Sequence, residues 1–145
     1  MALSLSPIQI VEIQILHFNF DVLNSSENSS CPTNINIGFS NGELSETEPQ
    51  NYRMEAQLDV ASCSEETDDN KFSFSMTVRG MFNGHYIEGG DTFDEFETFM
   101  EVNAFSLLYG FVRNYLQNFT ASTPIGQVVL PCVDSASIAV DLNQK

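Results

Sequence analysis

The run from Phe72 to Val78 alternates apolar and small polar residues without interruption. Its apolar members are Phe72, Phe74, Met76 and Val78, and a serine or threonine separates each from the next. Because successive side chains of a β-strand point to opposite faces, the run predicts a strand with one buried and one solvated face. The alternation stops at Gly80, where we expect the chain to turn so that Phe82 reaches the edge of a surface groove.

Three earlier segments are also predicted to be strands. Residues 52–60 alternate cleanly, and residues 34–39 form a shorter run. Residues 11–22 alternate in two phases, and the adjacent Ile15 and Leu16 at the switch indicate a bulge or a strand buried on both faces. Residues 24–34 are rich in Ser and Asn and predict a long loop, while residues 41–51 predict a polar turn. Four strands with polar connections favour an antiparallel sheet.

Beyond residue 92 the apolar period becomes helical. Thr92 is a suitable N-cap for a short segment at 93–100, with Asp94 and Glu95 in its first turn. From Asn103 a longer helix is predicted, ending near Pro124. Its apolar stripe contains Phe105, Leu108, Tyr109, Val112, Leu116 and Phe119. A last short helix is predicted after Asp134. Strands followed by helices indicate one α+β domain over residues 1–145.

The charge balance argues against several partners. There are 20 acidic and 5 basic residues, giving a formal net charge of -15, and the basic residues are scattered. Phosphate recognition needs clustered Lys and Arg, so nucleic acid and anionic membranes are poor partners. The N-terminus has no basic region and its apolar run is interrupted at Glu12, so neither a signal peptide nor a membrane insertion is predicted. We expect a cytoplasmic protein.

No pattern of catalytic or metal-binding residues is present. The 3 cysteines show no paired spacing, which disfavours a zinc site or a disulfide framework and fits a reducing compartment. There is no phosphate-binding loop and no nucleophile elbow. His17 and His85 have no partner of catalytic spacing. We therefore expect a non-enzyme with no cofactor and no metal.

The apolar stripe from Phe105 to Phe119 looks too wide for one sheet to cover. Two explanations remain open at this point: an ordinary monomer core, or a helix that is shared between subunits.

Several segments, taken in order, resemble the SecB family of export chaperones. "VEIQILHFNF" is similar to the family's first strand, and "RGMF" at 79–82 is similar to its Gly-hydrophobic-Phe step. "NAFSLLYGFVRNYLQNFTAST" at 103–123 is similar to its helix, and "LPCVD" at 130–134 to the step that follows. The resemblance extends from about Ile8 to Ala139.

The resemblance implies a four-stranded antiparallel sheet with a crossover first connection, one long helix and a short C-terminal helix on one face. It also implies a homotetramer, built as a dimer of dimers with the long helices at the interface. The interface residues would be Phe105, Leu108, Tyr109, Val112, Arg113, Leu116 and Phe119, with Arg113 paired to a carboxylate.

Proteins of this family hold unfolded polypeptides without nucleotide. The resemblance therefore implies unfolded clients as partners, with either an export motor or an antitoxin as a further one. The client-binding residues would be Phe20, Leu23, Ile35, Phe39, Phe82, Tyr86 and Ile87. Two other functions remain open: a small-ligand-binding or enzymatic domain with a closed apolar pocket near His85, and an oligomeric adaptor without chaperone activity.

Overall fold

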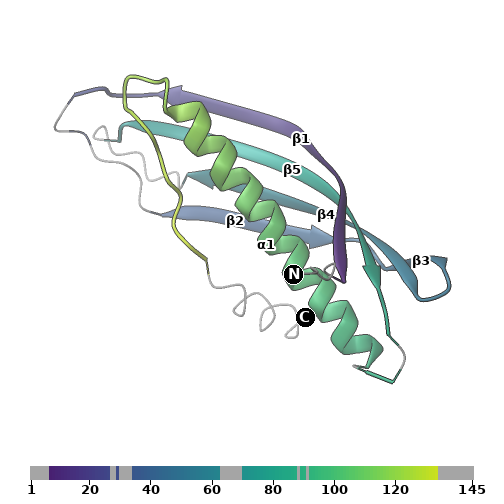
Figure 1. Cartoon of the computed structure of the whole chain (residues 1–145). Coiled ribbons are helices and arrows are strands. Elements are labelled where there is room, and N and C mark those ends of the chain that lie inside the picture. The colour runs from purple at the N-terminus through teal and green to yellow at the C-terminus, as the bar shows by residue number, and fades with distance from the viewer. Residues whose placement is uncertain are drawn as a thin grey trace, which may run out of the picture.

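The strands form one antiparallel sheet, and a long helix crosses one of its faces (Figure 1). A computed structural model describes residues 7–26, 29, 34–62, 70–87, 89–90 and 92–133. Its elements are β1 (Ile8–Val22), β2 (Ile35–Asn41), β3 (Ser45–Glu48), β4 (Asn51–Ser62), β5 (Phe72–His85) and α1 (Phe93–Thr120).

The strand order shows that the first connection crosses over. The main path of the sheet is β1-β5-β4-β2, so β1 and β2 follow one another in sequence yet lie at opposite edges. This confirms the predicted α+β class and the crossover. The polar turn predicted at 41–51 is partly wrong, because it contains β3, which pairs with the start of β4 beyond the end of β2. The short helix predicted after Asp134 lies outside the described residues.

Two bulges keep the apolar residues of β1 on one face. The register with β5 shifts between Ile10 and Glu12 and again between Ile15 and His17, so Val11 and Leu16 are the extra residues. Each extra residue reverses the alternation that follows it. As a result, Ile10, Ile13, Ile15, Phe18, Phe20 and Val22 all have partners on the face of β5 that α1 covers. The bulge predicted at Ile15 and Leu16 is confirmed.

Helix α1 is continuous, which corrects the prediction of two helical segments. Its N-cap is Thr92, as expected, and the Thr92 hydroxyl accepts a hydrogen bond of 3.2 Å from the backbone N–H of Glu95. No proline interrupts residues 93–120, and the Asn103 side chain donates 2.8 Å back to the carbonyl of Phe99 without opening the helix. The apolar pattern therefore runs through the expected break.

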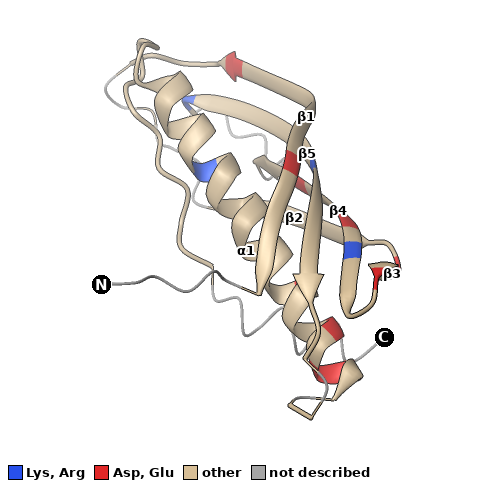
Figure 2. Ribbon diagram, turned by 45° about the vertical axis from the view of Figure 1, so that its right-hand side comes forward, with Lys and Arg blue, Asp and Glu red and all other residues tan. Residues whose placement is uncertain are grey.

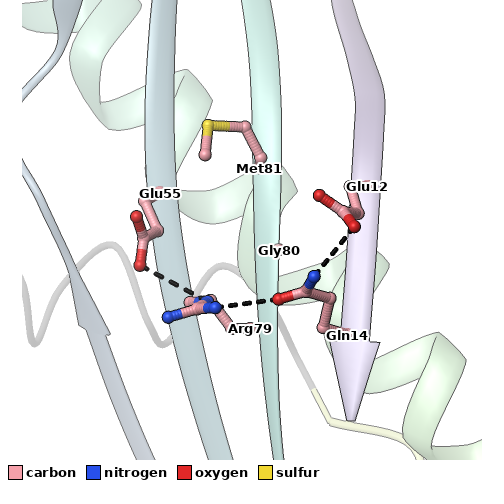
Figure 3. A pocket seen from close by; sticks show the side chains of 6 residues that line it. All are labelled: Glu12, Gln14, Glu55, Arg79, Gly80 and Met81. Carbon is pink, nitrogen blue, oxygen red and sulfur yellow. Dashed lines mark hydrogen bonds and ion pairs between the residues drawn. The ribbon is translucent and has the colours of Figure 1, made fainter. Parts of the chain in front are cut away.

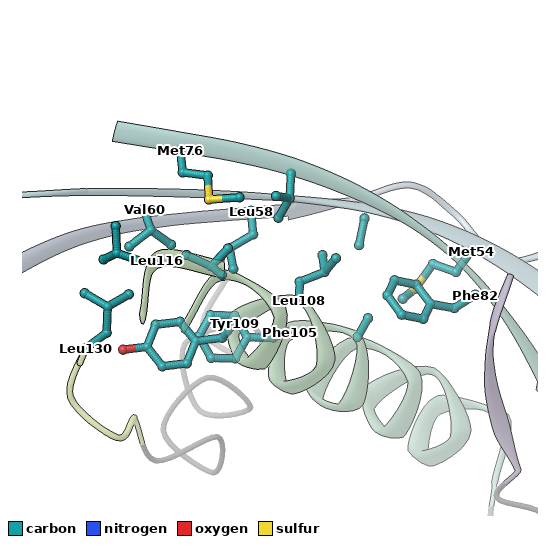
Figure 4. Close-up of a cluster of buried hydrophobic side chains, with 14 of the residues drawn as sticks. Met54, Leu58, Val60, Met76, Phe82, Phe105, Leu108, Tyr109, Leu116 and Leu130 are labelled. Atoms are coloured by element: carbon teal, nitrogen blue, oxygen red, sulfur yellow. The ribbon is translucent and has the colours of Figure 1, made fainter. Parts of the chain in front are cut away.

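Every fourth residue of α1 is buried. The row is Phe96, Met100, Ala104, Leu108, Val112, Leu116 and Thr120, and it packs on the alternating apolar residues of β4 and β5 (Figure 4). Rows of residues four apart run obliquely across a helix surface, so the helix crosses the strands at an angle rather than along them. This row, rather than the broader stripe read from the sequence, holds α1 on the sheet.

Gly80 provides space for this contact and does not turn the chain. β5 continues unbroken to His85, and Phe82 is fully buried in the core. A Cβ atom at Gly80 would lie 2.7 Å from the Phe82 ring and 2.8 Å from Cδ2 of Leu108. The expectation that Phe82 reaches a surface groove is therefore wrong: the missing side chain at Gly80 lets the Phe82 ring and Leu108 meet beneath the sheet.

We predict that alanine has opposite effects at two glycines. Gly80→Ala overpacks the core and should lower the free energy of unfolding by about 1–3 kcal/mol. Gly110→Ala should raise it by up to about 1 kcal/mol, because Gly110 lies inside α1 with open space where its Cβ would be. Urea unfolding at equal protein concentration measures both. A Gly80→Ala protein as stable as the native one would contradict the account of Gly80.

Candidate functional site: an open apolar face between β1 and α1

The flank of α1 nearest β2 is covered by the chain that follows the helix. The Phe105 ring contacts Phe39 of β2 at 5.6 Å. The Tyr109 hydroxyl donates to the carbonyl of Pro131, and Nε of Arg113 donates to the carbonyl of Leu130 at 3.0 Å. Residues 121–133 thereby fill this side of the helix.

The opposite flank, nearest β1, has no such cover in the described part of the chain. It presents partly exposed apolar residues at four-residue intervals, interrupted once by Asn103: Phe99, Leu107, Phe111, Tyr115 and Phe119. Phe18 of β1 contacts the rings of Tyr115 at 5.2 Å and Phe119 at 5.0 Å. These contacts place the flank beside β1 at the C-terminal end of the helix.

The adjoining part of β1 is also uncovered. α1 packs mainly on β4 and β5 and reaches β1 less (Figure 1). Ile10 is therefore 47% exposed and Ile15 40% exposed, although both have partners on the helix-covered face of β5. We define the open face as these residues: Ile10, Ile13, Ile15 and Phe18 of β1, with Phe99, Leu107, Phe111, Tyr115 and Phe119 of α1.

An apolar surface of this extent on a single chain is typical of an interaction site. β1 adds a second feature, since it is a 15-residue strand at the edge of the sheet. Edge strands offer unpaired backbone groups to another chain. The open face can therefore receive an extended, apolar polypeptide by both side-chain and backbone contacts.

The expected client-binding residues do not form one surface. Phe20 is half-buried against the rings of Phe72 and Phe119, and Leu23 is 57% exposed just beyond β1. Ile35 and Phe39 are half-buried on β2, at the other edge of the sheet. The half-buried Tyr86 and the exposed Ile87 follow β5, while Phe82 is in the core. Of the seven, Phe20 contacts the open face through Phe119, Phe82 is paired with Ile10 in the sheet register, and Tyr86 and Ile87 line a pocket with Phe99.

Five of the seven expected interface residues pack inside the chain. At most 5% of each residue is exposed, so these residues offer almost no surface to another subunit in this arrangement: Phe105, Leu108, Tyr109, Val112 and Leu116. Arg113 bonds to a backbone carbonyl instead of the expected carboxylate. Of the other two, Phe119 is 41% exposed and Arg113 is partly exposed.

Of the nine open-face residues, sequence reasoning named only Phe119 as a site residue. It missed Ile10, Ile13, Ile15 and Phe18 of β1, and Phe99, Leu107, Phe111 and Tyr115 of α1. A signal for the residues of α1 is present in the sequence, because apolar residues recur every fourth position both from Phe96 onward and from Phe99 onward. Two such rows side by side are more than one sheet face can bury. The sequence did not say which row would be left open.

Charge is distributed unevenly over the molecule. Figure 2 shows acidic residues at the start of α1 and around β3, with basic residues few and apart. On the sheet face away from α1, Arg79 lies 3.6 Å from a carboxylate oxygen of Glu55 and donates 2.8 Å to Gln14 (Figure 3). This outer face is polar, in contrast to the open face.

No catalytic or metal-binding arrangement is apparent among the described residues. They contain no group of three His, Cys, Asp or Glu side chains placed to hold a metal ion. The described pockets open onto the surface rather than forming a closed apolar cavity. No helix in this part of the chain is long and apolar enough to cross a membrane.

Comparison with known proteins identifies the fold. No family model and no curated protein matches the sequence. A SecB-like chaperone of Mycobacterium tuberculosis, solved in complex with an antitoxin peptide, matches over 88% of this chain and 88% of that chain, with a TM-score of 0.50 and 15% identity. The fold is SecB-like. A protein of unknown function from Streptococcus agalactiae also matches, over 86% of this chain and 97% of that one, with a TM-score of 0.53 and 18% identity.

The hydroxyl group of Tyr109 should make the stability of the SecB-like fold decrease at alkaline pH. Burial raises the pKa of its hydroxyl, an effect that the nearby charge of Arg113 opposes and Cys132 reinforces. A raised pKa means that the folded state holds the proton more tightly, so its contribution to stability is complete below about pH 10 and is lost as the pH rises further.

We therefore expect Tyr109→Phe to flatten the alkaline part of the stability profile. At neutral pH the variant should be less stable by about 1 kcal/mol, because the hydrogen bond to Pro131 is lost. Above about pH 10, the ordinary pKa of an unfolded tyrosine, its free energy of unfolding should fall less steeply than that of the native protein. Urea unfolding across this range measures the difference, and identical slopes would show that Tyr109 does not titrate as described.

Proposed function

We propose that this protein is an ATP-independent holdase that binds unfolded polypeptides on the open face. The observation that carries the proposal is the apolar flank of α1 beside the uncovered inner face of β1. An enzyme or a small-ligand protein would instead need a group of activated residues or an enclosed pocket, and neither is apparent in the described part of the chain.

The energetics of such a surface suit clients of many sequences. Burial of one large apolar side chain contributes roughly 2–3 kcal/mol, so three or four anchors reach micromolar affinity. The open face has nine apolar side chains from two elements. A client can use any few of them, so binding requires apolar residues but no fixed sequence.

The net charge of -15 supports the same function. It keeps a protein with an exposed apolar surface soluble, and it attracts basic unfolded chains from a distance. A preference for clients with net positive charge follows.

One structural neighbour supports a chaperone role, through similarity of fold alone. It is a SecB-like chaperone that was solved with an antitoxin peptide. By analogy we infer peptide binding by this chain, with delivery to an export motor and protection of an antitoxin as the two settings for it.

We also infer self-association, with a homotetramer as the expected assembly. The β1 edge and the accessible Phe119 are the features that favour contact between copies. Size-exclusion chromatography with light scattering should give a mass of about four chains. A stable monomer at micromolar concentration would contradict the assembly and weaken the SecB-like interpretation of the function.

The holdase proposal predicts a loss of protection when the open face is made polar. The double variant Ile10→Ser/Ile15→Ser removes two exposed anchors, each worth about 1 kcal/mol, so about thirty times more protein should be needed to stop a denatured model protein from aggregating. The assay is light scattering without ATP.

The matched control is Val129→Ser, which replaces a 54% exposed apolar residue outside the open face. It should protect as well as the native protein. The molar mass and the thermal midpoint of each variant are measured in parallel, so that a loss of assembly or folding is recognised. The proposal fails if the native protein gives no protection at stoichiometric ratio, or if the double variant protects equally well.

A further inference from the structure

An open surface pocket of about 680 Å³, called the polar pocket because most of the residues that line it have polar side chains, lies at one end of the sheet, where β1 begins and β5 ends. Arg53 of β4 and Asn83 of β5 are paired in the sheet register, on the face away from α1. Asn51, His85 and Thr47 also line the pocket. These side chains bring several hydrogen-bond donors to one place.

The guanidinium of Arg53 is oriented but not neutralised. Its Nε donates 3.1 Å to Oδ1 of Asn83, which leaves the two terminal nitrogens of Arg53 and the amide nitrogen of Asn83 free to donate elsewhere. Among the described residues Arg53 has no ion-pair partner. His85 is fixed beside it, with Nδ1 at 2.9 Å from Oδ1 of Asn51.

Arg79 on the same face has a carboxylate partner. It forms an ion pair with Glu55 and donates a hydrogen bond to the side-chain oxygen of Gln14 (Figure 3). Arg53 therefore differs from Arg79 in two ways: a pocket lies beside it, and no carboxylate of the described part of the chain is within ion-pair distance of it. A guanidinium with two free nitrogens matches a carboxylate in a bidentate arrangement.

The pocket favours a single negative charge. Glu48 also lines it, although no oxygen of Glu48 is within ion-pair distance of Arg53. A doubly charged phosphate would be repelled by this carboxylate more strongly than a singly charged carboxylate would be. Of these two anions, the carboxylate therefore fits the pocket better.

An apolar pocket of about 250 Å³ adjoins the polar one. The two share Pro7, His85 and Ile87 as lining residues, and the apolar pocket adds the rings of Tyr86, Phe96 and Phe99. Phe99 is also the first residue of the open face on α1. A polypeptide lying on the open face can therefore reach both pockets at this end.

We propose that the two pockets together bind the C-terminus of a client polypeptide. The free α-carboxylate bonds to Arg53 and Asn83, and the last side chain, an apolar one, packs against Tyr86, Phe96 and Phe99. An internal Asp or Glu fits less well, because its side chain is the carboxylate and that residue then has no apolar group for the second pocket. This inference rests on the proposed function and specifies which part of a client is recognised.

The test compares short, fluorescently labelled apolar peptides that differ at the C-terminus. One ends in Leu as the free acid, a second ends in Leu as the amide, and a third ends in Glu as the amide. Fluorescence anisotropy with the full-length native protein should show the free acid binding about five- to tenfold tighter than either amide.

Arg53→Gln should remove this preference and leave the affinity for the Leu amide unchanged. Arg79→Gln is the matched control, since it removes an exposed arginine from the same sheet face and should keep the preference. A thermal midpoint equal to the native value shows that each variant is folded.

Three results would overturn the inference: equal binding of free acid and amide, a preference that survives Arg53→Gln, or equal binding of the Glu amide and the Leu free acid. The last would indicate a general carboxylate site rather than a chain-end site. Aggregation suppression by the same preparation separates the two proposals. If suppression persists without a preference, only the chain-end site is rejected; if suppression is absent, the holdase proposal fails.

Discussion

The contact between the buried row of α1 and the glycine-containing face of β5 is the constraint on which the rest of the structure depends. Gly80 and Gly84 both lie under the helix, and a Cβ at either would come within 3 Å of a core side chain. The close approach requires α1 to cross the strands obliquely, because a row of every-fourth residues is oblique to the helix axis. The position of the helix decides which apolar surface is covered.

The oblique crossing leaves the two flanks of one helix with different roles. Residues 121–133 fold back over the flank nearest β2, and their backbone carbonyls accept hydrogen bonds from the side chains of Tyr109 and Arg113. The flank nearest β1 meets an edge strand whose two bulges present its apolar residues to the same side. Burial of such a surface by another chain is favourable, so the uncovered residues favour binding. The position of the helix also explains why most of the residues expected at a subunit interface are buried within the chain itself.

The site could be predicted from the sequence only in part. Two features could be predicted because they depend only on residues close in the sequence: the bulge at Ile15 and Leu16, and the capping role of Thr92. Phe82 was misplaced because its burial depends on Leu108, a residue 26 positions away that meets it through the space left at Gly80. The pocket at Arg53 was likewise not predictable, since it gathers residues of β1, β3, β4 and β5 that have no shared motif.

The sequence by itself determined the alternating strands, the long amphipathic helix, the α+β class and the acidity, because each follows from local periodicity or from composition. Resemblance in the order of weak motifs predicted a SecB-like fold with a crossover connection, as the structure has. Only the tertiary structure decided that the two helical segments join, which of the apolar rows on α1 is buried, and that Arg53 pairs with no carboxylate among the described residues. These outcomes depend on where a helix lies on a twisted sheet, and this position is set by packing between residues far apart in the chain.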